Sequence, residues 1–166
     1  MLLEDGIWPR LSKDGRLLAF VRIDAVTLER ELVVADADGQ NPQTLATTAQ
    51  FIDIDAPFFA PDGESLLFGA VDELQPTTSL LDRLLGVQAA AAHAVPSDWW
   101  RVPLNGGEPE RLTQLNEINM YADLSRDEEW HAFSGGTGLY VMDVGDWAVE
   151  KLVELEAASS LSWVEE

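Results

Sequence analysis

The residues of this chain that are suited to catalytic or metal chemistry are few. The sequence holds two histidines, His93 and His131, and no cysteine, which excludes thiolate chemistry and sites built from several imidazoles. His131 falls in an apolar run, where we expect a half-exposed strand residue. His93 falls near the end of an expected helix, where a positive charge is favourable. We therefore expect no catalytic residue, no cofactor and no metal ligand in this chain.

The glycine-rich segment from Ser134 to Gly138 invites comparison with loops that activate a nucleophile or bind phosphate. A nucleophile elbow needs a glycine two residues before its serine, where this chain has Ala132. A P-loop ends in Gly-Lys-Ser or Gly-Lys-Thr, and this segment has no lysine. The glycines fit a turn between two strands, and the sequence argues against an enzyme.

Two acidic groups need an interpretation. The segment from Asp36 to Asn41 has the Asp-x-Asp spacing of a calcium loop, but Thr47 stands at the twelfth position, where an EF-hand has a bidentate glutamate. A hairpin turn and a weak surface calcium site both stay open. Asp53, Asp55 and Asp62 are interpreted as a solvated acidic rim.

Composition limits the classes of protein. The chain has 166 residues, 46% of them apolar, which is enough for one globular domain. Its net charge of -20 argues against nucleic acid and anionic membranes as partners. No apolar run is long enough to span a bilayer, and Met1 lacks the basic start of a signal peptide. We expect a cytoplasmic protein if Met1 is the native start, and a periplasmic or exported one if the chain is internal.

One pattern occurs three times along the chain. Each copy has an aspartate three residues after a large apolar residue and six residues before a phenylalanine. Asp-Gly favours a hairpin, because aspartate accepts a local backbone N–H and glycine takes a positive φ without a Cβ clash. Glu128 stands where the third glycine is expected, so that turn is predicted to differ. The turn residues are Asp14, Gly15, Asp62, Gly63 and Asp127.

A second pair of apolar runs follows each copy, so each unit has four short strands. The spacing of 48 residues between Asp14 and Asp62 is typical of a propeller blade. An insertion over 72–97 interrupts the second unit. We predict an all-β fold: a partial β-propeller of three four-stranded antiparallel blades, the first strand of a fourth, and one helical insertion. The expected bounds are about 7–47, 52–114 and 119–154 for the blades, and about 159–164 for the extra strand.

The turns resemble a known family. Ser12-Lys13-Asp14-Gly15 and its two copies are similar to the Ser-Pro-Asp-Gly motif of TolB-like, WD40-like (PD40) β-propeller repeats. The segment from Gly106 to Thr113 is similar to the Gly-Gly and Leu-Thr stretch of those repeats. Lys13 and Arg126 replace the motif proline. The resemblance covers the chain from about Trp8 to Trp163, and it implies a non-enzymatic scaffold that binds a protein or peptide.

The insertion and the residues after it supply candidate partner contacts. Ser79 and Asp82 resemble a capping box, and leucines at helical spacing predict a helix over about 79–93. Two interpretations of its apolar face stay open: it packs on its own blade or plugs the ring, or it docks a partner or a second copy of the chain. Strand alternation sends two adjacent tryptophans to opposite faces, so one can serve as a surface anchor, although packing of both between blades stays open. The candidate contacts are Leu81, Leu84, Leu85, Trp99 and Trp100.

The family pattern implies about six blades, and this sequence contains three. Such an open arc leaves two apolar blade faces to be covered. Three interpretations stay open: a fragment or accessory domain of a larger hydrolase or transport-associated protein, a half-propeller that closes as a homodimer, and a stable open arc. The acidic charge predicts a basic protein or peptide partner whose binding weakens as salt rises.

Overall fold

The computed structural model describes residues 5–72, 96–118, 120–155 and 161–164. These residues form three four-stranded sheets, in which every strand is antiparallel to its neighbours. Each sheet pairs its strands in sequence order, so strands that follow one another in the chain are hydrogen-bonded neighbours. The described part of the chain contains no helix, and hence none long and apolar enough to cross a membrane. The all-β prediction with three four-stranded units is confirmed.

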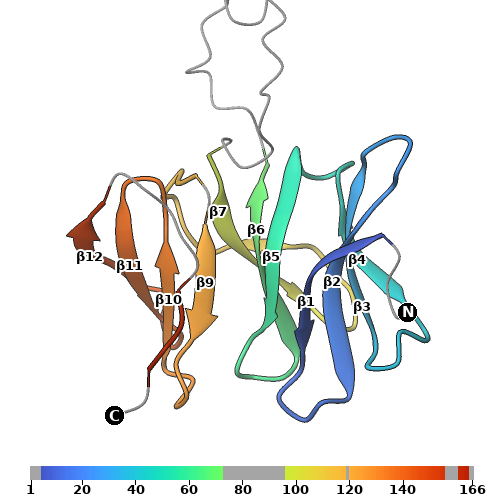
Figure 1. Ribbon diagram of the computed structural model, residues 1–166, viewed down its shortest axis with the longest axis horizontal. Coiled ribbons are helices and arrows are strands. Elements are labelled where there is room, and N and C mark those ends of the chain that lie inside the picture. Colours follow the sequence, from blue (N-terminus) through green and yellow to red (C-terminus); the bar gives the residue numbers. More distant parts are fainter. Residues whose placement is uncertain (1–4, 73–95, 119, 156–160, 165–166) are drawn as a thin grey trace, which may run out of the picture.

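The strands of the three sheets have the following bounds. The first sheet contains β1 (Gly6–Leu11), β2 (Leu17–Ile23), β3 (Arg30–Asp36) and β4 (Gln43–Thr47). The second contains β5 (Asp53–Phe59), β6 (Ser65–Val71), β7 (Asp98–Pro103) and β8 (Glu110–Arg111). The third contains β9 (Tyr121–Leu124), β10 (Trp130–Ser134), β11 (Gly138–Asp143) and β12 (Val149–Glu154). Figure 1 shows the sheets side by side, with β9, β5 and β1 neighbouring one another at the middle of the view.

Strand β6, in the sheet between the other two, is almost entirely apolar because both of its faces are covered. All seven residues of β6 are buried. Alternate residues of a strand point to opposite faces, so one half of such a strand packs against each neighbouring sheet. In β2, Ala19 and Val21 belong to the core shared with the second sheet, whereas Leu18 and Phe20 belong to a separate buried cluster on the opposite face.

Two cores hold the three sheets together. The core between the first and second sheets is mostly aliphatic, with Leu32, Ile54, Leu66 and Phe68 among its fully buried side chains. The core between the second and third sheets is aromatic and methionine-rich, and its buried members are Trp99, Met120, Phe133, Tyr140 and Met142.

The inner strands β1 and β5 share an irregularity at equivalent positions. The pairing register shifts between Ile7 and Arg10 in the first sheet and between Asp55 and Phe58 in the second. Trp8 and Ala56, each followed by a proline, have φ of 51° and 45°. A proline has no N–H to contribute to the ladder, so a bulge is a position that tolerates it. The first two sequence repeats therefore share this backbone irregularity as well as their residue pattern.

The helix expected over about 79–93, with Leu81, Leu84 and Leu85, lies outside the described residues, and the helical part of the predicted fold is not borne out. Residues 161–164 of the expected extra strand are described but are not in a strand. Trp163 nevertheless lies against β9, because its backbone N–H and its indole N–H donate to the carboxylate and the carbonyl of Asp123 at 3.4 and 3.2 Å.

Candidate functional site

The three repeat turns have the same backbone geometry. Gly15 and Gly63 have φ of 70° and 66°, and Glu128 has φ of 63° at the matching position. In each turn the N–H of this residue donates to the carbonyl three residues earlier, at 2.9 to 3.0 Å. The expectation that the third turn differs is therefore wrong. The hairpin imposes the left-handed conformation on a glutamate, for which it is unfavourable.

Aspartate and serine hold the turns in a shared pattern. Asp14 accepts hydrogen bonds from the Ser12 hydroxyl at 2.7 Å and the Arg16 N–H at 3.1 Å. Asp127 accepts from the Ser125 hydroxyl at 2.5 Å and from a backbone N–H. The serine hydroxyl is the largest cause that holds the pKa of both carboxyls below the usual range.

The second turn lacks that serine because Ala60 replaces it. Asp62 is held from the other side of the hairpin, where the Ser65 hydroxyl donates to it at 2.8 Å and Arg101 pairs with it. Each turn aspartate therefore stabilises a hairpin, which is the role that the family resemblance implies.

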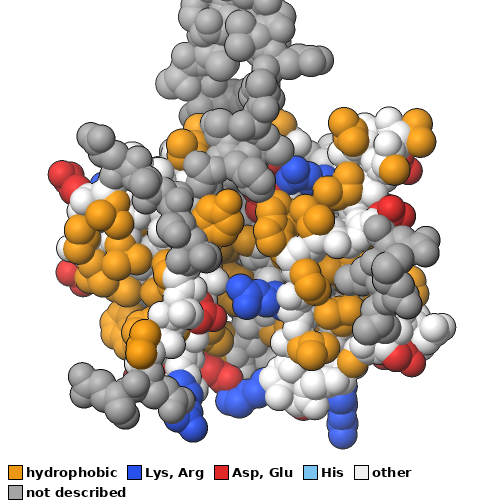
Figure 2. All heavy atoms as spheres, in the orientation of Figure 1, with side chains coloured by type: hydrophobic (Ala, Val, Ile, Leu, Met, Phe, Trp, Pro, Cys, Tyr) orange, Lys and Arg blue, Asp and Glu red, His pale blue; other side chains and the backbone are white. Residues whose placement is uncertain are grey.

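The three turns and the inner strands enclose one cleft, which we call the axial cleft. Its volume is about 550 Å³, and β1, β5, β9 and their turns line it. Figure 2 shows the corresponding hollow in the middle of this face, with Lys and Arg side chains at its centre and lower end. Leu11 is 60% exposed at the cleft, and the half-buried Phe58 and Phe59 line its second-sheet side.

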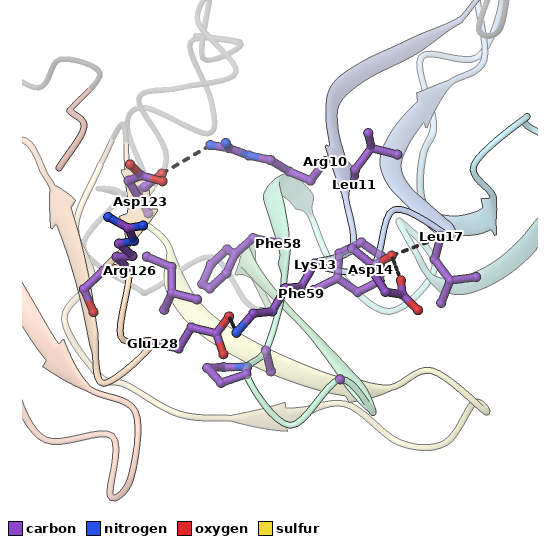
Figure 3. Close-up of a pocket in the computed structure, with 17 residues that line it drawn as sticks. Arg10, Leu11, Lys13, Asp14, Leu17, Phe58, Phe59, Asp123, Arg126 and Glu128 are labelled. Atoms are coloured by element: carbon purple, nitrogen blue, oxygen red, sulfur yellow. Dashed lines mark hydrogen bonds and ion pairs between the residues drawn. The ribbon is translucent and has the colours of Figure 1, made fainter. Parts of the chain in front are cut away.

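Two contacts cross the axial cleft and join the first sheet to the third. Lys13 forms an ion pair with Glu128, with Nζ 2.7 Å from Oε1. Arg10 donates from Nη2 to the carbonyl of Ala122 at 3.3 Å. Figure 3 shows Arg10 extending from β1 toward β9, and the dashed line between Lys13 and Glu128.

The axial cleft is electrostatically unlike the rest of the chain. Three basic residues line it, Arg10, Lys13 and Arg126, together with three acidic ones, Asp14, Asp123 and Glu128. The whole sequence has ten basic and thirty acidic residues. The cleft is thus balanced in charge within a strongly acidic protein. Its surface combines an apolar wall with polar groups of both signs.

The predicted tryptophan contacts lie between sheets. Trp99 is fully buried, with its ring centroid 4.7 Å from that of His131 and 5.6 Å from that of Phe58. Trp100 is half-buried on the other face of β7, where it packs edge-on against Phe51 at 4.9 Å. The opposite orientation of the two side chains follows the alternation that the sequence predicts. Of the two, Trp100 is the one that a partner can reach without opening the protein.

The exposure expected for His131, and that expected for Asp53 and Asp55, are both wrong. His131 was expected to be a half-exposed strand residue, and it is fully buried. Asp53 and Asp55 were expected on a solvated rim, and they instead accept hydrogen bonds from Nη1 of Arg30 at 2.5 and 2.6 Å. Their partner comes from the neighbouring sheet, so no local sequence pattern reveals it.

The segment from Asp36 to Asn41 forms the turn between β3 and β4. The backbone N–H of Gly39 donates to the Asp36 carbonyl at 2.7 Å, and the Asn41 amide donates to the Asp36 carboxylate at 2.6 Å. This geometry is that of a hairpin turn. Among the described residues, no cluster of three or more His, Asp or Glu side chains is placed to hold a metal ion.

Sequence reasoning missed the basic residues of the axial cleft. The sequence shows Lys13 and Arg126 as replacements of the motif proline, but it does not show that both side chains line the same cleft. The signal that could have found them is the repeat itself. Equivalent positions of successive units lie at the same end of the sheets, so replacements at one motif position gather in space.

Comparisons with known proteins agree with this geometry. No family model and no curated protein matches the chain. Among solved structures, the chain is similar to TolB from Acinetobacter baumannii, with 20% identity and a TM-score of 0.60 over 89% of this chain. A putative TolB from Agrobacterium tumefaciens gives 18% identity and a TM-score of 0.66 over 93%. A puromycin-hydrolyzing peptidase from Mycobacterium tuberculosis gives 21% identity and 0.59 over 89%.

The fold is a partial β-propeller. The three sheets are its blades, and β1, β5 and β9 are the first strands of those blades. The chain spans 32% and 52% of the lengths of the two TolB proteins and 22% of the peptidase. At these identities the similarity establishes the architecture alone.

Proposed function

We propose that this chain is a non-enzymatic scaffold that binds a protein or peptide at the axial cleft. The observation that carries the proposal is the convergence of three equivalent turns on a single hollow of about 550 Å³. Its lining combines exposed Leu11 and half-buried phenylalanines with charged groups at the rim. Pockets that hold small ligands are typically of this size, with apolar walls and a few polar groups that fix orientation, and we propose that this one receives an apolar side chain of the partner.

A non-enzymatic role fits the chemistry of the described residues. His131 is enclosed by Phe58 and Trp99, so it is not within reach of a substrate as a general base. The repeat aspartates are occupied in holding turns. The remaining histidine, His93, lies outside the described residues.

The partner that we propose is basic at its periphery and apolar where it enters the cleft. The net charge of -20 attracts a basic partner over long range, while the cleft itself is balanced in charge. Raising the ionic strength should therefore weaken binding, because salt screens the long-range attraction. An affinity that does not change with salt would contradict a basic partner and leave the cleft proposal standing.

The cleft is tested with a peptide-display library selected on the immobilised protein. Peptides that the protein enriches should lose about tenfold or more in affinity on Leu11→Asp, because a carboxylate then faces their apolar side chain. The matched control is Val26→Asp, which places the same charge at a side chain that is 90% exposed outside the axial cleft. Equal affinity for the two variants, or no enriched peptide, would overturn the proposal.

As a second candidate function we keep the self-assembling half-propeller, or the equivalent contact with the next blade of a larger hydrolase or transport-associated protein. Trp130 and Val153 point away from the second blade and are 40% and 49% exposed. Sedimentation of the purified chain measures whether it associates with itself. A dimer that Trp130→Glu dissociates supports assembly through this face, and a monomer at all concentrations excludes self-assembly.

A further inference from the structure

His131 occupies the interface between the second and third blades, and the proposed function makes no use of it. Its ring centroid lies 4.1 Å from that of Phe58 in β5 and 4.7 Å from that of Trp99 in β7. The residue is fully buried. Neither ring nitrogen has a hydrogen-bond partner among the described residues. This imidazole is therefore held as a neutral, apolar-packed ring.

The surroundings of the ring give no support to a positive charge. Within the third blade, His131 lies opposite Leu124 of β9 and Met142 of β11. From the second blade, β5 and β7 present Phe58 and Trp99. The charged group whose field acts on the ring is the guanidinium of Arg10, from β1. No carboxylate of the described residues pairs with it.

Burial, and to a smaller extent the repulsion from Arg10, lowers the pKa of His131 from 6.5 to about 3. A histidine whose pKa is lower in the folded state binds fewer protons there than in the open state. Its contribution to stability is complete above about pH 6.5 and is lost as the pH falls toward 3.

We propose that His131 is an acid-sensitive latch, whose protonation releases the third blade from the second. A charged imidazole gains hydration only if β10 separates from Phe58 and Trp99. Phe58 also lines the axial cleft, and β9 forms the opposite wall. Release of the latch therefore dismantles the cleft, so acid switches off the surface that the third blade completes. The latch itself does not depend on what the cleft binds.

The test is hydrogen exchange of the whole chain at pH 7.5 and pH 5, with rates corrected for the intrinsic effect of pH. Opening that takes up one proton predicts that the protection of β10 falls about 30-fold between these two conditions. His131→Phe should abolish the pH dependence of β10. The matched control is His93→Gln, which removes the other histidine of the chain and should keep the fall in protection. An equal fall in His131→Phe, or no fall in the parent, overturns the latch.

A second measurement covers the case in which His131→Phe does not fold. In the His93→Gln background, His131 is the single histidine, so its imidazole resonances can be followed by NMR as the pH is lowered. The native resonance should stay that of a neutral ring until the third blade opens. A native ring that titrates near pH 6.5 would show that the site accepts the charge while closed, and would overturn the proposal.

Discussion

The two interfaces between blades are closed by different chemistry, although the blades share one architecture. Between the first and second blades, the core is mostly aliphatic, and Arg30, Asp53 and Asp55 form a largely buried ion cluster that joins the two sheets. Between the second and third blades, aromatic rings surround a neutral histidine. Blades of one architecture can therefore be joined by side chains of different chemistry. Each contact then has its own response to pH.

The ion cluster responds to pH in the opposite direction to His131. Asp53 and Asp55 share a single guanidinium nitrogen of Arg30, so one positive charge faces two carboxylates. Burial, followed by the repulsion from Asp53, raises the pKa of Asp55 to about 7. A carboxyl with a raised pKa stabilises the folded state most below its unfolded value of 3.8, and this stability is lost as the pH rises toward 7. The first interface is thus strongest in acid and the second near neutral pH.

The largest effect is expected from removing the centre of the aromatic interface. Trp99→Ala should lower the free energy of unfolding by about 3 to 5 kcal/mol, because the side chain is fully buried against three aromatic rings. Trp100→Ala, on the half-buried face of the same strand, should cost less. Urea unfolding of both variants at pH 7.5 measures the difference. An equal cost would mean that the two faces of β7 are packed equally well.

An intermediate effect is expected from the ion cluster. Asp55→Asn removes the titration while keeping the shape of the side chain, so stability should no longer fall as the pH rises from about 4 to 7. At pH 8 the variant should be more stable than the parent, by up to a few kcal/mol. Urea unfolding along a pH series measures the change.

Asp146→Asn is the control for that series, because it removes a carboxylate at an exposed turn that accepts a backbone N–H. If Asp55→Asn kept the pH slope of the parent, the opposite response of the two interfaces would be disproved.

The smallest effect is expected at the contact that joins the first and third blades across the cleft. Glu128→Gly should relieve the left-handed backbone at φ 63°, a gain of about 1 kcal/mol, while it loses the ion pair with Lys13. Glu128→Gln keeps the backbone and removes the charge, at a cost of about 0 to 1 kcal/mol, because Lys13 is exposed. Thermal unfolding of the two variants separates these contributions. A Glu128→Gly variant less stable than Glu128→Gln would contradict the backbone argument.

The repeated hairpins were predictable because their causes are local. An aspartate three residues after an apolar residue accepts hydrogen bonds from its own turn, and short runs rich in apolar residues build most of the paired strands. The left-handed Glu128 was not predictable, because its residue type disfavours that conformation. There the pairing of β9 with β10 decides the turn. Lys13 and Arg126 depart from the repeat motif in the sequence, but only the packing of the blades brings them to the same cleft.

The sequence by itself determined the three units, their turns and the opposite orientation of Trp99 and Trp100, because these depend on spacing along one strand or hairpin. Only the tertiary structure decided that His131 is buried, that Asp53 and Asp55 share Arg30, and that Lys13 meets Glu128. Each of these contacts joins residues of different blades. The physical reason is that desolvation and ion pairing depend on neighbours in space, and those neighbours are set only when the blades pack.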